Sequence, residues 1–311
     1  MKIIKDNIES LTIEKSVITI GNFDGIHSGH RLLFKKICER AKILNAASVI
    51  ITFEQHTSTF FKNDQRPIRL TTFDEKVLVL RNSDVDYLIC LDFNEKLASL
   101  SAADFVRTIL IERLKAVEWI MGKNHTFGKD RKGTYDFLHN SDDKNHINVF
   151  ALNLHTEDTI VASSTKIRNL IGESRIDDAV GMLGHPYPIL VQRIRGMRIG
   201  FKLGYPTLNF KCPPSRKVIP PPGIYAAEVE YNGLLLKGAL YFGNCPTFDN
   251  RDYHFEFHAL EPVTCDPGVN TEAALWLYSF IRPEKKFNSE DLLIEQIRKD
   301  IFLIQQIFFK E

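Results

Sequence analysis

The hydrophobic pattern of the chain changes once, near residue 184, and this change is the strongest constraint on its fold. Before it, helical periodicity over residues 30–45 and 102–114 alternates with short apolar runs at residues 16–20, 48–53, 87–93, 117–121 and 147–152. Alternating strand and helix units are typical of a parallel sheet that is covered on both faces. We therefore expect an α/β domain with a parallel sheet in the first half of the chain.

The second half follows a turn-rich junction, GHPYP at residues 184–188, which a helix does not cross easily. Beyond the junction, six β-type runs succeed one another without a helix, at residues 189–194, 206–210, 223–231, 234–242, 253–260 and 273–280. Six such runs predict a small antiparallel β-barrel. The predicted domains are therefore residues 1–184 and 185–311.

The chain ends in a predicted amphipathic helix that follows Asn288 or Ser289, either of which can cap it. Its apolar stripe has helical spacing and consists of Ile294, Ile297, Ile301, Ile304 and Phe308. We expect this stripe to pack on the second domain and not to bind a partner.

Composition excludes several classes of function. The 311 residues carry 40 basic and 39 acidic side chains, so no strong field draws the chain to nucleic acid or to an anionic membrane. The apolar stretches are too short to span a bilayer, and the first residues lack a signal-peptide pattern. Five scattered cysteines without a CxxC pair indicate reduced thiols and a cytoplasmic protein. We expect small-molecule substrates, no nucleic acid and no membrane partner; self-association stays open.

The most informative motif is GNFDGIHSGH, residues 21–30, between the first strand and the first helix. In an open parallel sheet, ligands bind at the carboxyl ends of strands beside helix N-termini. Gly21 and Gly25 permit close backbone approach, and His27 and His30 can face one point where free N–H groups favour an anion. The motif predicts a phosphate site; the alternative is that the histidines only cap a turn.

A second phosphate cradle is predicted at ASSTKIRNLI, residues 162–171. Here Ser163, Ser164 and Thr165 precede a helical turn that carries Arg168, so hydroxyl and N–H donors gather near an arginine. Taken alone, the segment is more typical of an ordinary helix cap, and only its pairing with the histidine motif favours the phosphate interpretation.

A third motif, GMRIGFKLGYPTLNF at residues 196–210, lies in the second half. Glycines at 196, 200 and 204 allow backbone amides to approach phosphates, although a glycine-rich turn is the simpler interpretation. Thr207 and Asn209 follow on one strand and offer oxygen ligands that suit Mg²⁺.

These motifs, in this order, resemble the HxGH nucleotidyltransferase superfamily and, over residues 18–300, the bifunctional prokaryotic riboflavin kinase/FAD synthetase family. Further blocks in family order are TFEQHT (52–57), RLTTFDEK (69–76), GKNHTFGKDRKGT (122–134), PPGIYAAEV (221–229), GNCPTF (243–248), FEFHAL (255–260) and FIRPEKKF (280–287). The resemblance implies a Rossmann-like nucleotidyltransferase domain followed by a riboflavin kinase barrel. It also implies two reactions: ATP and Mg²⁺ convert riboflavin to FMN, and adenylylation of FMN then gives FAD and pyrophosphate.

The resemblance implies a role for each matching residue. It makes Glu256 the general base toward riboflavin, and the other catalytic residues would be His27, His30, Asn124 and Arg168. ATP contacts would come from Gly21, Asn22, Phe23, Asp24, Gly25, His27, His30, Ser163, Ser164, Thr165, Arg168, Gly196, Gly200 and Gly204. Flavin contacts would come from Phe53, His56, Asn124, Phe127 and Arg282. The Mg²⁺ ligands would be Thr207 and Asn209.

The chain departs from the family pattern at several positions. His125 stands in place of a phenylalanine, and Tyr241 and Cys245 stand where bacterial members commonly have Asn and Arg. The barrel departures motivate one alternative, a monofunctional FAD synthetase whose barrel is a flavin-binding or assembly module. A further alternative is an HxGH nucleotidyltransferase that acts on another phosphorylated or alcohol substrate.

Overall fold

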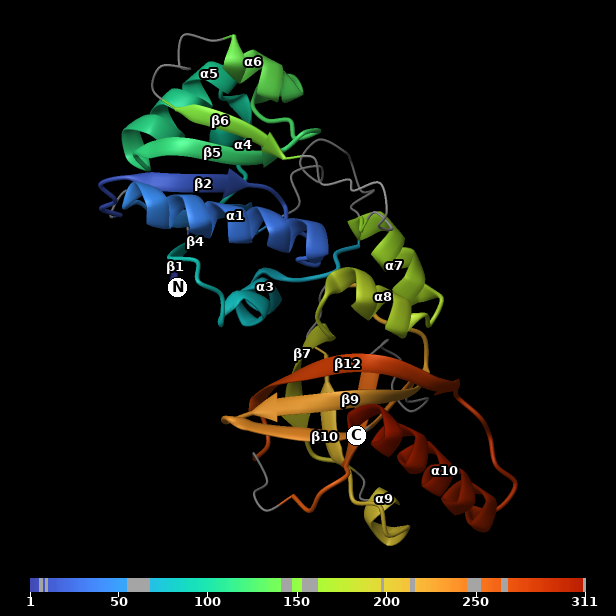
Figure 1. Cartoon of the computed structure of the whole chain (residues 1–311). Coiled ribbons are helices and arrows are strands. Elements are labelled where there is room, and N and C mark those ends of the chain that lie inside the picture. Colours follow the sequence, from blue (N-terminus) through green and yellow to red (C-terminus); the bar gives the residue numbers. More distant parts are fainter. Residues whose placement is uncertain are drawn as a thin grey trace. The chain divides into compact units, whose positions relative to one another are not determined.

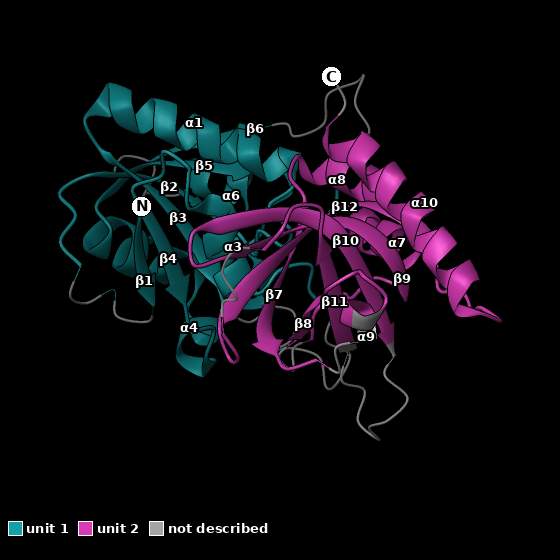
Figure 2. Ribbon diagram, turned by 90° about the horizontal axis from the view of Figure 1, so that it is seen from below, with its two compact units in different colours: residues 1–163 teal, residues 164–311 magenta. Residues whose placement is uncertain are grey.

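The chain forms two compact units, Met1–Ser163 and Ser164–Glu311 (Figure 2). The computed structural model describes residues 1–5, 8, 11–54, 68–140, 147–152, 162–196, 199–212, 216–244, 253–263 and 268–309. By its contacts, the second unit includes helices α7 (Ser164–Gly172) and α8 (Ile176–Leu183). Gly184 ends α8 in a left-handed conformation, as expected of the junction, while the domain boundary after residue 184 stays a prediction.

A six-stranded sheet forms the centre of the first unit (Figure 1). All its neighbouring strands pair in parallel, in the order β1 (Lys2–Lys5), β4 (Tyr87–Leu91), β3 (Ala47–Phe53), β2 (Ser16–Ile20), β5 (Ala116–Gly122) and β6 (Asn148–Leu152). Every residue of β2 is buried, in keeping with its central place and its mainly apolar sequence. The predicted parallel α/β domain is confirmed.

Two apolar cores lie on the two faces of this sheet. Helices α1 (Ser28–Leu44) and α3 (Phe73–Leu80) cover one face, and Val17 of the sheet belongs to the core that lies beneath them. The opposite face, which includes Ile18, is covered by α5 (Ala102–Asp104) and the π-helix η2 (Phe105–Arg113). Successive strand residues thus enter different cores. Within the described residues, the unit also contains the short helices α4 (Glu95–Ser99), η3 (Lys129–Arg131) and α6 (Tyr135–His139).

One strand of the sheet was not predicted from the sequence. β1 is only four residues long, mostly exposed, and pairs with β4 alone at the edge of the sheet. Its sequence KIIK has neither the length nor the apolar run of a buried parallel strand, so its pattern resembles that of a solvated segment. The five strands expected from the sequence all lie close to their predicted positions.

The second unit contains a closed, antiparallel six-stranded barrel, as predicted. Its strand order is β10 (Leu234–Asn244), β11 (Tyr253–Ala259), β8 (Leu208–Lys211), β7 (Tyr187–Ile194), β12 (Glu272–Pro283) and β9 (Gly223–Tyr231). Closure leaves no free sheet edge in the barrel. A four-residue helix, α9 (Ile199–Lys202), lies between β7 and β8 in the chain.

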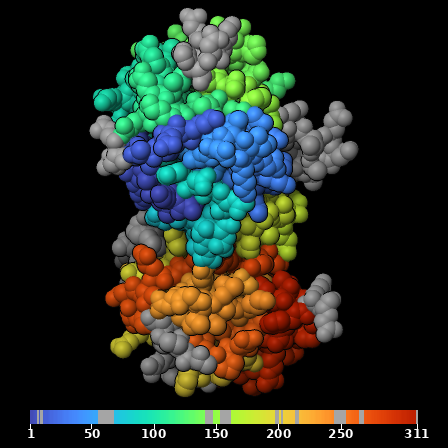
Figure 3. Space-filling model, turned by 60° about the vertical axis from the view of Figure 1, so that its left-hand side comes forward, coloured from blue at the N-terminus to red at the C-terminus, as the bar shows by residue number. Residues whose placement is uncertain are grey.

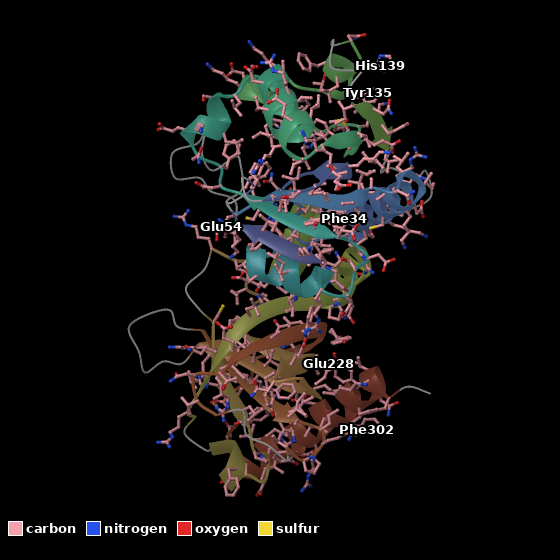
Figure 4. The ribbon with its side chains drawn as sticks, turned by 90° about the vertical axis from the view of Figure 1, so that its left-hand side faces the viewer. Phe34, Glu54, Tyr135, His139, Glu228 and Phe302 are labelled. Carbon is pink, nitrogen blue, oxygen red and sulfur yellow. The ribbon has the colours of Figure 1, made fainter. Side chains whose placement is uncertain are left out.

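The terminal helix α10 (Glu290–Phe308) lies beside β9 and β10 (Figures 1 and 3). Ser289 caps it by accepting a hydrogen bond from the Leu292 N–H, and Ile304 of the predicted stripe is completely buried. Other apolar side chains of α10, such as Phe302, are exposed (Figure 4). The expectation that the stripe packs on the second domain is confirmed.

Replacing Ile304 by alanine should lower the free energy of unfolding by about 2–5 kcal/mol, because it removes buried methyl groups and leaves a cavity. Ile307→Ala on the same helix is the matched control; its side chain is 39% exposed, so we expect a loss below about 1 kcal/mol. Urea denaturation of both variants measures the difference. Equal losses would contradict the packing of the stripe.

Candidate active sites

The loop between β2 and α1 has a strained conformation. The N–H of Gly21 donates to the Ile51 carbonyl at 3.0 Å, so the loop starts at the carboxyl edge of the sheet. Phe23 and Ile26 have left-handed φ angles of 43° and 46°, although neither is glycine, and both are buried. Such residues persist where the surroundings over-determine the backbone, which is typical of ligand-binding loops.

Asp24 anchors this loop from inside. Its buried carboxylate accepts hydrogen bonds from the N–H groups of Leu70 and Thr71, at 2.9 and 3.1 Å. The Thr71 hydroxyl in turn accepts from the Gly25 N–H at 2.9 Å. These contacts show that Asp24 fastens the loop to residues 70 and 71; its role toward ATP stays a prediction.

Lys76 on α3 is a second anchor, and the sequence motifs did not single it out. Its buried ammonium donates to the Asn22 carbonyl at 2.5 Å and to the Thr52 hydroxyl at 3.2 Å. Burial lowers the pKa of Lys76 to about 8, against the opposing effect of Asp24, so the group is mostly charged at neutral pH. A lysine on an amphipathic helix is ordinarily solvated, so only the fold reveals this contact.

The two histidines lie together at the N-terminus of α1. The rings of His27 and His30 stack with centroids 3.6 Å apart, and Phe23 packs edge-on against His30. Both Nδ1 atoms are buried without a hydrogen-bond partner among the described residues, and His27 makes no capping bond. This arrangement favours the phosphate interpretation over simple turn capping.

Both imidazoles are neutral at neutral pH. Burial lowers the pKa of His27 to about 4, although Asp24 opposes the shift. The pKa of His30 lies well below its usual range because of burial, and then because of its neighbours His27 and Lys76. A neutral imidazole carries one N–H donor, so the pair can donate hydrogen bonds to a phosphate without acting as cations.

Other predicted residues of the first unit lie at the same sheet edge. Asn124 is exposed in the turn that follows β5, and Phe53 is half-buried at the end of β3, against Phe93. Phe127 is 8% exposed and packs in the core with its ring centroid 4.8 Å from that of Trp119. The flavin contacts of Phe53, Asn124 and Phe127 stay predictions, and His56 lies outside the described residues.

His125, the residue that departs from the family pattern, lies against the edge of Trp119, with ring centroids 5.8 Å apart. Its Nε2 is buried and has no hydrogen-bond partner in the described part of the chain. Burial, with a smaller effect of Arg131, lowers the pKa of His125 to about 4. The ring therefore occupies an apolar site that a phenylalanine would fill without an unsatisfied nitrogen.

The second predicted cradle forms the start of α7. Ser163 precedes the helix, Ser164 begins it, and the exposed Thr165 hydroxyl accepts from the Arg168 guanidinium at 3.4 Å. Ser164, Thr165 and Arg168 thus lie in α7 of the second unit, while Ser163 is the last residue of the first unit. Their contacts with ATP stay predictions.

The predicted kinase residues meet on the barrel. Strand pairing places Glu256 of β11 opposite Asn209 of β8. The Thr207 hydroxyl donates to Glu256 Oε2 at 3.5 Å, and Asn209 Nδ2 donates to the Thr207 hydroxyl at 3.4 Å. Phe255 and Phe257 are completely buried while the Glu256 side chain is 32% exposed, so the glutamate occupies the face of the strand opposite the two phenylalanines.

The glycines before this cluster make room for it. A Cβ atom at Gly196 would lie 2.3 Å from Asn209 Nδ2, and one at Gly200 would lie 2.4 Å from the Tyr205 carbonyl oxygen. Gly204 has a φ of +83°, which side chains rarely adopt. The glycine spacing therefore has a steric reason in the protein itself; the predicted approach of phosphates is a separate proposal.

Arg282, expected to contact flavin, forms a bidentate ion pair with buried Asp300 of α10 at 2.7–3.0 Å. Its flavin contact stays a prediction. Tyr241, which departs from the family pattern on β10, donates through its hydroxyl to Glu284.

His254, which no sequence motif assigned, also lies beside Asn209. Its Nε2 is 2.7 Å from Asn209 Oδ1.

The donor set around Glu256 fits a magnesium ion. A threonine hydroxyl, an amide oxygen and a carboxylate are the oxygen ligands that Mg²⁺ prefers, and here they lie together. Among the residues that the structure describes, no group of three or more His, Cys, Asp or Glu side chains could hold a metal ion.

Fold and sites together define a two-unit protein with one candidate site at the edge of a parallel sheet and another on a closed barrel. Residues 10–166 match the family model described as FAD synthetase, and residues 183–308 match that described as riboflavin kinase. The chain belongs to the family of bifunctional riboflavin kinase/FMN adenylyltransferases.

Relatives of that name match over almost the whole chain. The protein from Buchnera aphidicola subsp. Schizaphis graminum is 33% identical over 99% of both chains. The protein from Escherichia coli (strain K12) is 31% identical over 99% of this chain and 98% of its own.

A crystal structure described as a macrolide-efflux protein from Streptococcus pneumoniae superimposes with a TM-score of 0.83. It is 28% identical and covers 96% of this chain and 97% of its own. Within the described ranges, this chain has no helix of the length and apolarity needed to cross a membrane.

Replacing His125 by phenylalanine should reduce the loss of stability in acid. Its pKa is near 4 in the folded protein, against an ordinary 6.5, so between these values the unfolded chain binds a proton that the folded chain excludes. Stability therefore falls as the pH drops through this window, and the variant removes one contribution. Calorimetric melting of the first unit at pH 7 and pH 5 measures the change.

The control for this experiment is His139→Gln, which alters an exposed histidine on α6 (Figure 4). This variant should lose stability in acid as the wild type does. If His125→Phe also loses as much as the wild type, the assigned burial of the imidazole is wrong.

Proposed function

We propose that this chain catalyses two consecutive steps of FAD biosynthesis. The barrel phosphorylates riboflavin to FMN with ATP, and the predicted N-terminal domain, residues 1–184, adenylylates FMN to FAD with release of pyrophosphate. The observation that carries the proposal is the match to bifunctional enzymes over 99% of the chain, with both groups of site residues present. The substrates are small molecules. None of the described cysteines Cys38, Cys90 and Cys212 forms a disulfide, which supports our proposal of a cytoplasmic enzyme.

Adenylyl transfer requires an in-line attack by an FMN phosphate oxygen on the α-phosphorus of ATP, whose bond to the pyrophosphate oxygen breaks. Both reactants are anions, so donors must spread the charge that grows in the transition state. The neutral N–H groups of His27 and His30 and the N-terminus of α1 supply such donors. Asn124 lies at the same edge, and the resemblance assigns Ser163, Ser164, Thr165 and Arg168 to the triphosphate.

Phosphorylation of riboflavin needs a base for the terminal hydroxyl and a group that holds the phosphates. Glu256 is half-exposed and adjacent to Thr207, so it can accept the hydroxyl proton as the oxygen attacks the γ-phosphorus, whose bond to the bridging oxygen of ADP breaks. Thr207 and Asn209 would hold Mg²⁺, which neutralises charge on the phosphates when bound. The alternative of a non-catalytic barrel is not favoured, because residues 183–308 match the riboflavin kinase family and bifunctional relatives match the whole chain; Cys245 lies outside the described residues.

The two activities can be separated by mutation. The purified protein is incubated with ATP and Mg²⁺ and either riboflavin or FMN, and the flavins are resolved by chromatography. His27→Ala should lower FAD formation at least about 100-fold, because a charge-stabilising donor is lost, and should leave FMN formation intact. Glu256→Gln should stop the formation of FMN from riboflavin and leave the rate of conversion of FMN to FAD unchanged. A wild type that makes FAD from FMN but not from riboflavin would refute the kinase assignment.

Lys76→Met should lower FAD formation by up to about 100-fold, because the loop carbonyl of Asn22 loses its anchor while the aliphatic stem is retained. Removing the ammonium also raises the pKa of His30, so the acid limb of the pH profile should move to higher pH. Riboflavin phosphorylation is the internal reference. Lys42→Met removes an exposed lysine and should change neither the rate of FAD formation nor its pH profile. An unchanged rate and pH profile in Lys76→Met would contradict the role of Lys76 as an anchor of the loop.

A further inference from the structure

His254 is a side chain of the kinase site that no sequence motif assigned. It precedes Glu256 by two residues on β11, so both side chains lie on the same face of the strand. The neighbouring strands place Lys211 of β8 and Gly243 of β10 opposite His254. The imidazole is 22% exposed, so it is neither a core side chain nor a freely solvated one.

The contacts of His254 involve both functional groups of the site. Its Nε2 lies 2.7 Å from Asn209 Oδ1 and 3.6 Å from Glu256 Oε1. The Asn209 amide nitrogen faces the carbonyl and hydroxyl oxygens of Thr207, at 3.4 Å each, so the amide oxygen is the atom that faces the ring. Both neighbours of Nε2 are acceptors, which requires the ring proton to be on Nε2.

Four side chains thereby form a closed ring: Thr207 contacts Glu256, Glu256 faces His254, His254 bonds to Asn209, and Asn209 returns to Thr207. The terminal torsions of asparagine and glutamate are broad, so neither group holds its own orientation. An amide oxygen has two lone pairs, so Asn209 can accept from His254 and still offer an electron pair to a cation.

We propose that His254 is a positioning residue of the kinase site, whose Nε2–H orients the Asn209 amide oxygen and the Glu256 carboxylate for riboflavin phosphorylation. This inference rests on the proposed kinase function. It adds a partner that holds the metal-binding oxygen and the base in one arrangement, as outer partners of metal ligands commonly do.

The test compares His254→Ala and His254→Gln in the full-length protein. His254→Ala should lower kcat for total FMN plus FAD from riboflavin by about 10- to 100-fold. Adenylylation of added FMN, measured on the same preparation, should be unchanged. Glutamine can donate an N–H from a similar position, so His254→Gln should recover most of the lost rate, which a general packing role would not predict.

His258→Gln is the matched control, because His258 lies on the same face of β11 but contacts the Pro206 carbonyl oxygen. It should retain the wild-type rate. A second readout is binding of Mn²⁺ with ADP and riboflavin, followed by electron paramagnetic resonance, which His254→Ala should weaken about 10-fold or more.

The outcomes separate the inference from the function on which it rests. Wild-type kcat and Mn²⁺ affinity in His254→Ala would overturn the positioning role and leave the kinase assignment intact. Equal losses in His254→Ala and His258→Gln, or a parallel loss of FMN adenylylation, would also overturn it. A wild type that does not phosphorylate riboflavin would overturn the proposed kinase function and this inference with it.

Discussion

Two buried charges hold the loop on which the first site is built. Asp24 accepts hydrogen bonds from two backbone N–H groups, and the Lys76 ammonium donates a hydrogen bond to a loop carbonyl. Charges are tolerated inside a protein when their hydrogen bonds are satisfied, as they are here. This anchoring keeps Phe23 and Ile26 in strained backbone conformations. Burial also lowers the pKa of the adjacent histidines, so that they are neutral donors. Loop geometry and imidazole chemistry therefore both depend on the burial of this loop and of the first turn of α1.

The barrel builds its site by strand pairing instead of a loop. Register places Glu256 opposite Asn209, and alternation along β11 puts Glu256 and His254 on the face opposite the buried phenylalanines. Because these positions follow from a closed network of antiparallel pairs, the polar cluster needs no strained backbone of its own. The glycines at 196 and 200 complete this arrangement by leaving space that side chains elsewhere would fill.

Local patterns predicted much of this molecule. Periods of two and of about 3.6 residues located the parallel sheet, the barrel strands and the terminal helix, because those periods reflect which faces are buried. The HxxH pair and the pair Thr207 and Asn209 were also predicted, since each pair lies within a single motif and its residue types suit phosphate or Mg²⁺. Glu256 lies in a separate motif, and only the family resemblance assigned its role. β1 was missed because an exposed four-residue edge strand has no such period.

The sequence by itself determined the order of the elements, the two-part architecture and the chemical kinds of side chain at each site. Only the tertiary structure decided how these side chains are used. It paired Arg282 with Asp300, buried Lys76 under the loop, and brought His254 to Asn209. These pairs join residues 18, 54 and 45 positions apart. No local period encodes such contacts, because packing of whole elements sets which side chains meet and which lose their water.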